Sequence, residues 1–286
     1  MKKVLVTGSE GFIGKYLVEQ LRFLNYEVFS YNRTDGDIEF ESTWEKFEKV
    51  DIVIHLAAKS FVPNSWIQPK EFVNTNLNGT LEALKYCKKH NSKLLFLSTY
   101  LYGNPIILPV SENSIIDCTN PYTLSKKMAE DVCLFYNKVF NIPVTILRPF
   151  NVYGPGQSEY FIIPKICNEV INSGFVKLGD VSPKRDFVFI NDLIDAIVLS
   201  IDNLNGFNIY NIGSGKSISI FDVVNSIFNL SGVNNNYISD ENVRPGEIMD
   251  SIADITKINS ELGWVPKWNL ESGLLEMIKF YKTKKE

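Results

Sequence analysis

Short, continuous apolar runs alternate with longer segments of helical period along the first half of the chain. Such runs lie at 27–31, 51–56, 94–97 and 144–147, and loops or helix-like stretches separate them. Continuous apolarity indicates strands that are buried on both faces, so these runs predict a parallel sheet covered by helices. The sequence therefore predicts an α/β protein with a doubly wound parallel sheet.

An earlier apolar run, at 4–7, leads directly into three glycines spaced three residues apart: Gly8, Gly11 and Gly14. In a strand, turn and helix unit, the first glycine allows a sharp turn and the second lets a diphosphate approach the backbone. The third lets helix and strand pack closely. The free N–H groups at the helix start then favour an anion. The segment predicts a Rossmann-type dinucleotide cradle; a glycine-rich hairpin is the alternative.

The pattern changes after about residue 150, where helices mix with short strands. We predict a dinucleotide-binding domain over 1–150 and a smaller, mainly substrate-binding lobe over 151–286. Residues 186–205 are the exception, because their apolar residues predict a helix that packs back onto the first domain. We expect Asn191 and Asp192 to cap that helix. The basic end, 282–286, is predicted to be disordered.

Composition excludes several classes of function. The chain has 286 residues, 45% of them hydrophobic and 22% charged, which is ordinary for a soluble globular protein. A formal charge of −4 without a lysine-rich block argues against nucleic-acid binding, and no apolar run approaches the length of a membrane span. Four cysteines without CxxC spacing indicate free thiols and a cytoplasmic protein, and two histidines offer no histidine-rich metal site.

Polar residues with catalytic potential follow the run at 94–97. Ser98 and Thr99 come directly after this strand, at the edge where open α/β sheets place their ligands. Turn residues of no further role are the alternative.

A second polar group begins a predicted helix. Asn120 is a good N-cap and Pro121 suits the first helical position, so Tyr122 and Lys126 share one helix face, one turn apart. A nearby ammonium lowers the pKa of a phenol, which lets Tyr122 exchange a proton with a substrate oxygen near neutral pH. The other Tyr-x-x-x-Lys pair, at Tyr281, ends the basic tail, and we expect no catalytic role for it.

Together these motifs resemble the extended short-chain dehydrogenase/reductase family, the epimerases, dehydratases and reductases of nucleotide sugars. The resemblance extends over nearly the whole chain. It rests on the glycine turn, His55-Leu56-Ala57-Ala58, the NxxGT-like segment at Asn76, the SSxxVYG-like segment 98–103, NPYxxSK at 120–126, LRxFNVYGPGQ at 147–157, RDFV-like residues from Arg185 and an RPGD-like segment from Arg244.

The resemblance implies roles for individual residues. Tyr122 would be the proton donor or acceptor, Ser98 would hydrogen-bond the same oxygen, and Lys126 would hold the cofactor ribose and tune Tyr122. The cofactor-binding residues implied are Gly8, Gly11, Phe12, Ile13, Gly14, Asn32, Arg33, Asp37, Ile38, Leu56, Ala57, Ala58, Asn76, Lys126 and Pro149. The substrate-binding residues implied are Thr99, Asn151, Arg185, Arg244 and Glu247.

The residues after the strand at 27–31 indicate which cofactor is used. An acidic residue there would bind the ribose 2′-hydroxyl of NAD, whereas arginine accommodates the 2′-phosphate of NADP. Asn32 stands in the acidic position and Arg33 follows it, which favours NADP. Glu10 favours NAD, because its carboxylate would repel a phosphate near the same ribose.

The family carries out several reactions. Related dehydratases have a carboxylate within the two positions after the active hydroxyl, whereas this chain has Thr99 and Tyr100 there, which disfavours dehydration. We therefore expect NADPH-dependent reduction of the 4-keto group of a nucleoside-diphosphate 4-keto-6-deoxy sugar. The chain is similar to nucleotide-sugar 4-ketoreductases of surface-polysaccharide pathways, such as those that build O-antigen sugars. The alternative enzyme is an NAD-dependent nucleotide-sugar 4-epimerase, and the non-enzymatic alternative is a nucleotide-sensing regulator. By analogy with the family, a homodimer would form through 70–90 and 121–140.

Overall fold

The computed structural model describes residues 1–240 and 247–285, and within them a 6-stranded parallel sheet forms the centre of the molecule. Its strand order is β10-β5-β4-β3-β1-β2. The strands are β1 (Lys3–Thr7), β2 (Glu27–Tyr31), β3 (Ile52–His55), β4 (Lys93–Leu97), β5 (Val144–Pro149) and β10 (Phe207–Ile212). The strands predicted from the apolar runs are confirmed, with ends that differ by at most two residues.

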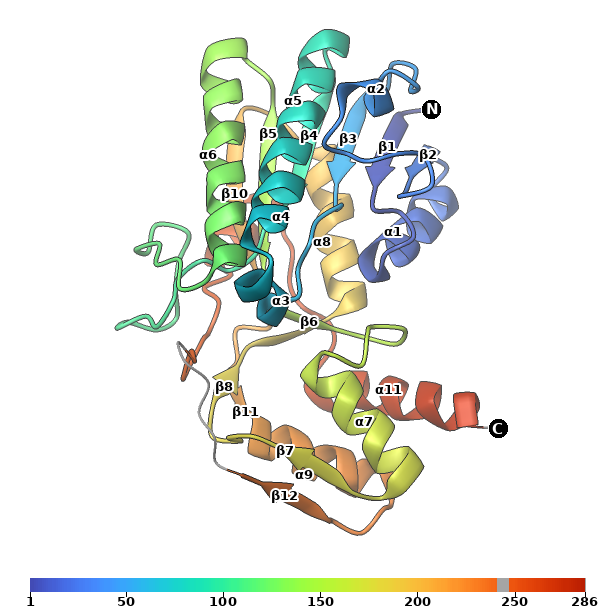
Figure 1. Cartoon of the computed structure of the whole chain (residues 1–286), viewed down its shortest axis with the longest axis vertical. Coiled ribbons are helices and arrows are strands. Elements are labelled where there is room, and N and C mark those ends of the chain that lie inside the picture. The colour runs from blue at the N-terminus through green and yellow to red at the C-terminus, as the bar shows by residue number, and fades with distance from the viewer. Residues whose placement is uncertain (241–246, 286) are drawn as a thin grey trace.

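Helices cover both faces of this sheet, which confirms the doubly wound architecture (Figure 1). One face carries α5 (Gly79–His90) and α6 (Pro121–Phe140), and the other carries α1 (Phe12–Phe23) and α8 (Ile190–Asp202). Successive side chains of β1 alternate between the two cores: Val4 and Val6 join the core of α1 and α8, and Leu5 joins the core of α5. This two-sided burial explains the continuous apolar runs.

Shorter helices lie, along the chain, between the strands of the sheet and the long helices that pack on it. They are α2 (Glu41–Trp44), α3 (Val62–Ile67) and α4 (Pro69–Val73), which continues through a π-helical turn, η1 (Asn74–Asn78), into α5. None of the helices in the described residues is both long enough and apolar enough to span a membrane.

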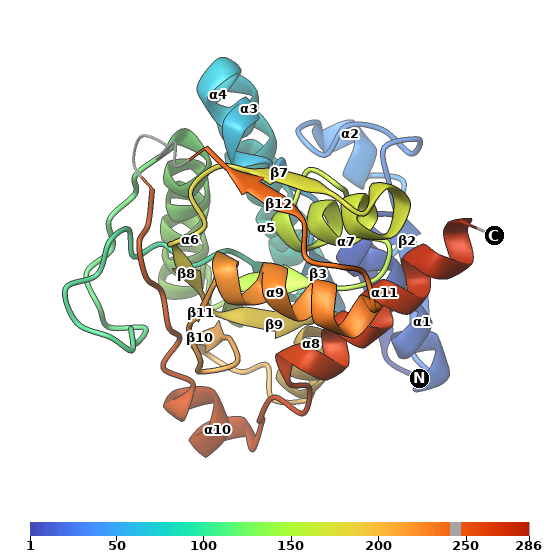
Figure 2. The same cartoon turned by 90° about the horizontal axis from the view of Figure 1, so that it is seen from below.

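A second lobe lies beyond the carboxyl ends of the strands, as Figures 1 and 2 show. Its helices α7 (Ile162–Ser173), α9 (Ile220–Ser231) and α11 (Leu270–Lys285) pack together. Around them lie β6 (Asn151–Tyr153) with β9 (Phe187–Phe189), β7 (Val176–Leu178) with β12 (Tyr237–Ser239), and β8 (Lys184–Arg185) with β11 (Ile218–Ser219). The short helix α10 (Thr256–Leu262) contacts β10.

Two local predictions were wrong. Helix α8 begins at Ile190 with Phe189 as its N-cap, so Asn191 and Asp192 lie inside the first turn. The Asp192 carboxylate instead accepts hydrogen bonds from the backbone N–H groups of Lys267 and Trp268. The basic end was predicted to be disordered from residue 282, but residues 282–285 are helical, because α11 continues to Lys285. Tyr281, on the apolar face of this helix, is buried.

We predicted that residues 186–205 pack back onto the first domain, and the structure extends this return beyond residue 205. After α8, β10 pairs in parallel with β5 and forms the edge of the 6-stranded sheet. Residues 207–212 therefore contribute to the first lobe, while the domain boundary near residue 150 stays a prediction.

Candidate active site

A cavity of about 420 Å³ lies at the carboxyl ends of the central strands. The chain passes from β1 to β2 on one side of β1 and then to β3 on the other, which makes this edge the topological switch point where such sheets bind ligands. Five segments bring predicted site residues to its wall. These residues are Gly8, Gly11, Phe12, Ile13, Gly14, Leu56, Ala58, Ser98, Thr99, Tyr122, Lys126, Pro149 and Asn151.

The glycine turn forms one end of the cavity. Gly8 has φ +69°, and a Cβ on Gly14 would lie 2.2 Å from the carbonyl oxygen of Gly8, so both positions require glycine. No side chain caps α1, whose N-cap is Gly11, and the first N–H groups of a helix have no partner within it. These N–H groups and the helix dipole fit a dinucleotide diphosphate.

The Ser98 hydroxyl lies at the same edge without a partner. Ser98 is 4% exposed, and within the described residues its Oγ makes no hydrogen bond. Its backbone N–H donates to the carbonyl of Leu147, which fixes the residue at the end of β4. A buried hydroxyl without a partner is costly, so this donor suits a ligand oxygen.

The start of α6 places the phenol and the ammonium as the sequence predicted. Asn120 and Thr123 form a reciprocal capping box, with the Thr123 N–H 2.9 Å from Asn120 Oδ1. Tyr122 and Lys126 follow one turn apart, and both line the cavity. Lys126 is 3% exposed, and its Nζ donates to the carbonyl of Leu97 at 2.7 Å.

Burial sets the protonation of both groups, and it contradicts one prediction. Burial raises the pKa of Tyr122 to about 12, with Thr99 opposing part of the shift, whereas we expected Lys126 to lower it. Burial also lowers the pKa of Lys126 to about 7, although the nearby Glu130 carboxylate opposes this. The expectation was wrong because desolvation disfavours the charged form of each group and outweighs the effect of its polar and charged neighbours.

Four predicted cofactor residues lie around the end of β2 and outside the cavity wall. Asn32 donates from Nδ2 to Glu10 Oε1 at 3.3 Å and accepts from the N–H of Thr34. Arg33 is exposed and forms no ion pair within the described residues. Asp37 accepts from the N–H of Glu39, while Ile38 is buried.

Ala57 and Asn76 also do not line the cavity. The Ala57 N–H donates to Thr7 Oγ1 at 3.2 Å. Asn76 is 1% exposed, and its amide accepts from the N–H of Lys59 and donates to the Lys59 carbonyl and to Ser125 Oγ. Its side chain thus joins the loop after β3 to α6 and has no donor left for a ligand.

The predicted substrate residues separate into two groups. Thr99 and Asn151 line the cavity, and the Asn151 side chain donates to the carbonyl of Asp186. Arg185 and Glu247, both implied to bind substrate, form an ion pair with each other. Arg185 also donates to the carbonyl of Ile248, which lines the cavity, so the pair borders the site. Arg244 lies outside the described residues.

Aromatic residues that the sequence did not mark complete the wall. Tyr100 and Phe150 stack with ring centroids 5.1 Å apart, and both line the cavity. Phe161 lines it from the second lobe, with its ring 6.3 Å from that of Phe61. Tyr100 and Phe150 lie within motifs that we had identified, but nothing in their spacing distinguishes a cavity wall from a core.

Comparisons with known proteins agree with this geometry. Residues 4–213 match the NAD dependent epimerase/dehydratase family. A candidate UDP-glucose 4-epimerase of Methanocaldococcus jannaschii is 34% identical, with 98% of each chain covered. The GDP-6-deoxy-D-mannose reductase of Pseudomonas aeruginosa is 26% identical, with 99% of this chain and 98% of that protein covered.

The crystal structure of a UDP-glucose 4-epimerase with UDP-glucose, from Thermotoga maritima, superimposes with a TM-score of 0.94 at 27% identity. It covers 99% of this chain and 100% of that one. The glycine turn, the Ser98, Tyr122 and Lys126 cavity and these matches lead to one conclusion: the chain belongs to the NAD dependent epimerase/dehydratase family, within the extended short-chain dehydrogenases/reductases.

Proposed function

We propose that this protein reduces the 4-keto group of a nucleoside-diphosphate 4-keto-6-deoxy sugar with NADPH. The observation that carries the proposal is the meeting of Ser98, Tyr122 and Lys126 in a cavity that ends at the glycine turn. Family members named for nucleotide sugars, including a GDP-6-deoxy-D-mannose reductase, support the substrate class. Thr99 and Tyr100 after Ser98 provide no carboxylate for dehydration.

The residues divide the chemistry between them. The reduced nicotinamide, when bound, supplies a hydride to the carbonyl carbon. Tyr122 donates its phenolic proton to the carbonyl oxygen, which becomes the hydroxyl of the product. Ser98 donates a hydrogen bond to the same oxygen, and Lys126, when protonated, favours the tyrosinate that remains until solvent returns a proton. A Tyr122 pKa of about 12 keeps this donor protonated at neutral pH.

The choice of NADPH rests on the end of β2. Asn32 stands where an acidic residue would bind the ribose 2′-hydroxyl of NAD, and Arg33 is an exposed cation without an ion pair in the described residues. A guanidinium fork suits the oxygens of a 2′-phosphate.

A second enzymatic function, 4-epimerisation with tightly held NAD, is favoured by Glu10. Its carboxylate accepts from the Asn32 amide, so an anion already borders the position of the 2′-phosphate. Relatives named as UDP-glucose 4-epimerases add to this support.

The cofactor content and activity of freshly purified protein distinguish the reductase from the epimerase. A reductase is expected to lose its cofactor on purification and to oxidise added NADPH, measured by absorbance, in step with reduction of a dTDP-, UDP- or GDP-linked 4-keto-6-deoxy sugar. An epimerase is expected to retain NAD and to interconvert UDP-glucose and UDP-galactose without added cofactor. The second result would replace the reductase proposal.

Tyr122→Phe tests the assignment of the proton donor. We expect kcat to fall by about 10²- to 10⁴-fold, the usual contribution of a positioned acid. Tyr281→Phe is the matched control, because it removes the hydroxyl from the other Tyr-x-x-x-Lys pair, and Tyr281 is buried in the core of the second lobe. Equal rates for Tyr122→Phe and the wild type would refute the mechanism. Tight nucleotide binding by a wild type without turnover would instead favour a regulator.

We also propose a cytoplasmic homodimer that works in surface-polysaccharide synthesis. Leu124, Phe135 and Val139 of α6 are about half exposed and offer an apolar contact surface. Light scattering of the wild type and of Phe135→Glu tests the dimer, which this charge is expected to dissociate.

A further inference from the structure

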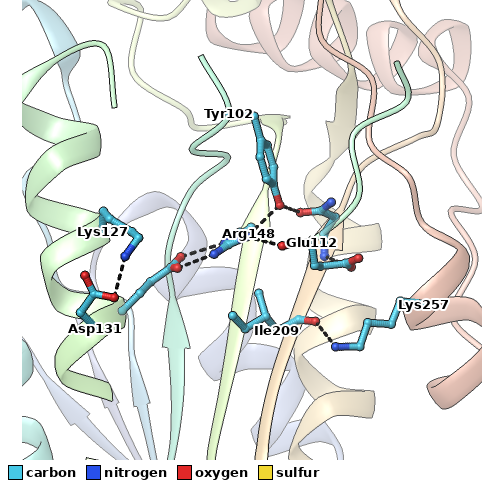
Figure 3. Close-up of polar contacts among 9 residues, drawn as sticks. Tyr102, Glu112, Lys127, Asp131, Arg148, Ile209 and Lys257 are labelled. Atoms are coloured by element: carbon cyan, nitrogen blue, oxygen red, sulfur yellow. Dashed lines mark hydrogen bonds and ion pairs between the residues drawn. The ribbon is translucent and has the colours of Figure 1, made fainter. Parts of the chain in front are cut away.

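One buried arginine, Arg148, contacts both the helix that carries Tyr122 and Lys126 and the segment that begins with Ser98. Arg148 is the penultimate residue of β5 and is 3% exposed. The residues that follow it, Pro149, Phe150 and Asn151, line the cavity. Arg148 itself does not line the cavity, and its guanidinium enters a network of polar side chains, drawn in Figure 3.

The first partner of Arg148 is Glu130 on α6. Arg148 Nε donates to Glu130 Oε1 at 3.0 Å and Nη2 donates to Oε2 at 2.6 Å, so the contact is bidentate. Glu130 is 4% exposed. It follows Lys126 by one helical turn and Tyr122 by two, and the three side chains therefore share one face of α6. The fork fixes this face relative to the end of β5.

The second partner is the segment after β4. Arg148 Nη1 donates to the Tyr102 hydroxyl at 2.9 Å and to the Glu112 carbonyl at 3.3 Å. Tyr102 follows Ser98 by four residues, and its hydroxyl donates to Asn211 Oδ1 at 2.6 Å. The Asn211 N–H in turn donates to the Glu112 carboxylate at 2.7 Å. The network therefore joins β5, α6, β10 and the segment that begins with Ser98.

We propose that the Arg148 and Glu130 pair is a positioning device that holds the Tyr122 and Lys126 face of α6 against the strand ends carrying Ser98 and Asn151. The proposal rests on the proposed function, in which Tyr122 and Ser98 meet at one reacting oxygen, Lys126 acts on Tyr122, and Asn151 contacts the substrate. The contact of Lys126 with the Leu97 carbonyl shows how closely α6 and β4 approach. Neither Arg148 nor Glu130 lines the cavity, so neither is a catalytic residue.

A double variant separates positioning from stability. Arg148→Met and Glu130→Leu, made singly, each leave a buried charge unpaired and are expected to unfold at lower temperature. The double variant removes both charges of the pair, so neither partner is left unpaired, and it is expected to regain thermal stability. If the pair positions α6, kcat of the double variant stays about 100-fold below that of the wild type, the size expected for a misplacement of about 1 Å, with little change in KM for NADPH. Recovery of both stability and kcat would overturn the proposal.

Two milder variants test the proposal even if the Arg148 and Glu130 variants do not fold. Tyr102→Phe removes a hydroxyl that accepts from Arg148 and donates to Asn211, and it is expected to lower kcat only about 5-fold because the contact between Arg148 and Glu130 stays in place. Asp131→Asn is the matched control on the same helix, because Asp131 pairs with Lys127 at 2.6 Å on the exposed side (Figure 3). We expect no change in rate for this variant. Unchanged kcat in Tyr102→Phe would count against the proposal.

Failure of the proposed reductase function can be distinguished from failure of the positioning proposal. If the wild type epimerises and does not reduce, the same variants are assayed for epimerisation, which needs the same side chains. If the wild type does neither, hydrogen exchange provides the test. Amides of residues 121–130 are expected to exchange faster in the stable double variant than in the wild type, relative to amides of 131–140. Unchanged exchange would overturn the proposal.

Discussion

The two lobes position their parts of the cavity wall in different ways. In the first lobe, the wall residues follow paired strands of the central sheet. In the second lobe, a buried carboxylate binds the backbone of the loops near the cavity. Gly8, Leu56 and Ser98 follow β1, β3 and β4, which are neighbours in the sheet. In the second lobe, Asp186 is 0% exposed and accepts from the N–H groups of Ser214, Gly215 and Ala253.

This difference determines how each lobe responds to change. A sheet distributes its backbone hydrogen bonds over many residues, so no single side chain is required for them. Asp186 concentrates four hydrogen bonds on one carboxylate, counting the Ser214 hydroxyl, and its carbonyl also accepts from Asn151 in the cavity wall. Apart from the buried Arg148 and Glu130 pair, the first lobe should therefore be sensitive mainly to steric change at its glycines, and the second to loss of individual acceptors.

The largest effect is expected at Gly14. A Cβ there would lie 2.2 Å from the Gly8 carbonyl oxygen, which is backbone and cannot rotate away, so Gly14→Ala should destabilise the protein by about 3 kcal/mol or more. Gly11→Ala is the contrasting variant, because its Cβ would meet only Gly8 O, at 3.1 Å. We expect Gly11→Ala to remain folded and to bind NADPH at least about 10-fold more weakly, measured by fluorescence titration. Normal NADPH affinity in Gly11→Ala would contradict the diphosphate cradle.

The next effect is expected at Asp186. Both carboxylate oxygens accept from backbone N–H groups, so Asp186→Asn turns an amide NH₂ toward a donor and should cost about 2–3 kcal/mol. Hydrogen exchange should show the loss of protection first around residues 213–215 and 253, with the central sheet unaffected. Asp195→Asn is the control, because its ion pair with Lys267 is largely exposed and should contribute below about 1 kcal/mol. Equal loss of protection in both lobes would refute the contrast between them.

The sequence predicted the first lobe well because its signals are local. Continuous apolar runs marked β2 to β5, and Asn120 with Pro121 marked the start of α6. The fold then brings the residues that follow these strands to one edge, as expected for parallel strands. Most of the predicted cavity wall follows from these two facts.

Predictions failed where contacts are distant in sequence or where burial decides the outcome. Sequence spacing also does not reveal that Arg185 pairs with Glu247, 62 positions away, and the role of both residues in binding substrate stays a prediction. Asp192 resembled an N-cap, but its acceptors serve a loop that lies more than 70 positions later. The raised pKa of Tyr122 depends on desolvation by several segments, and no spacing of residues reveals that.

A smaller effect is expected from the pH dependence of stability. Burial lowers the pKa of Lys126 from 10.5 to about 7, so above pH 7 the unfolded chain binds a proton that the folded protein has released. Stability should therefore rise with pH, by at most about 1.4 kcal/mol per unit, from pH 7 to about pH 8.5. Above that range the raised pKa of the buried Cys87 thiol opposes the trend, because the unfolded thiol ionises first.

Urea denaturation at several pH values measures this slope. Lys126→Met should remove most of it, since the titrating group is gone. Lys127→Met, on the exposed side of the same helix, should leave the slope unchanged. A slope that persists in Lys126→Met would mean that another group of the folded protein releases the proton.

The smallest effect is expected at the cofactor end, where an exposed side chain is involved. Arg33→Ala should weaken NADPH binding about 10-fold, the size of one charge-assisted contact, and leave NADH binding unchanged, because only NADPH carries the 2′-phosphate. Glu10→Gln should act in the opposite direction, since it removes a carboxylate that lies beside Asn32. Both affinities are measured by fluorescence titration at fixed ionic strength, because salt screens exposed charges. Equal weakening of NADH and NADPH in Arg33→Ala would show that Arg33 does not distinguish the two cofactors, and NAD would then be the better assignment.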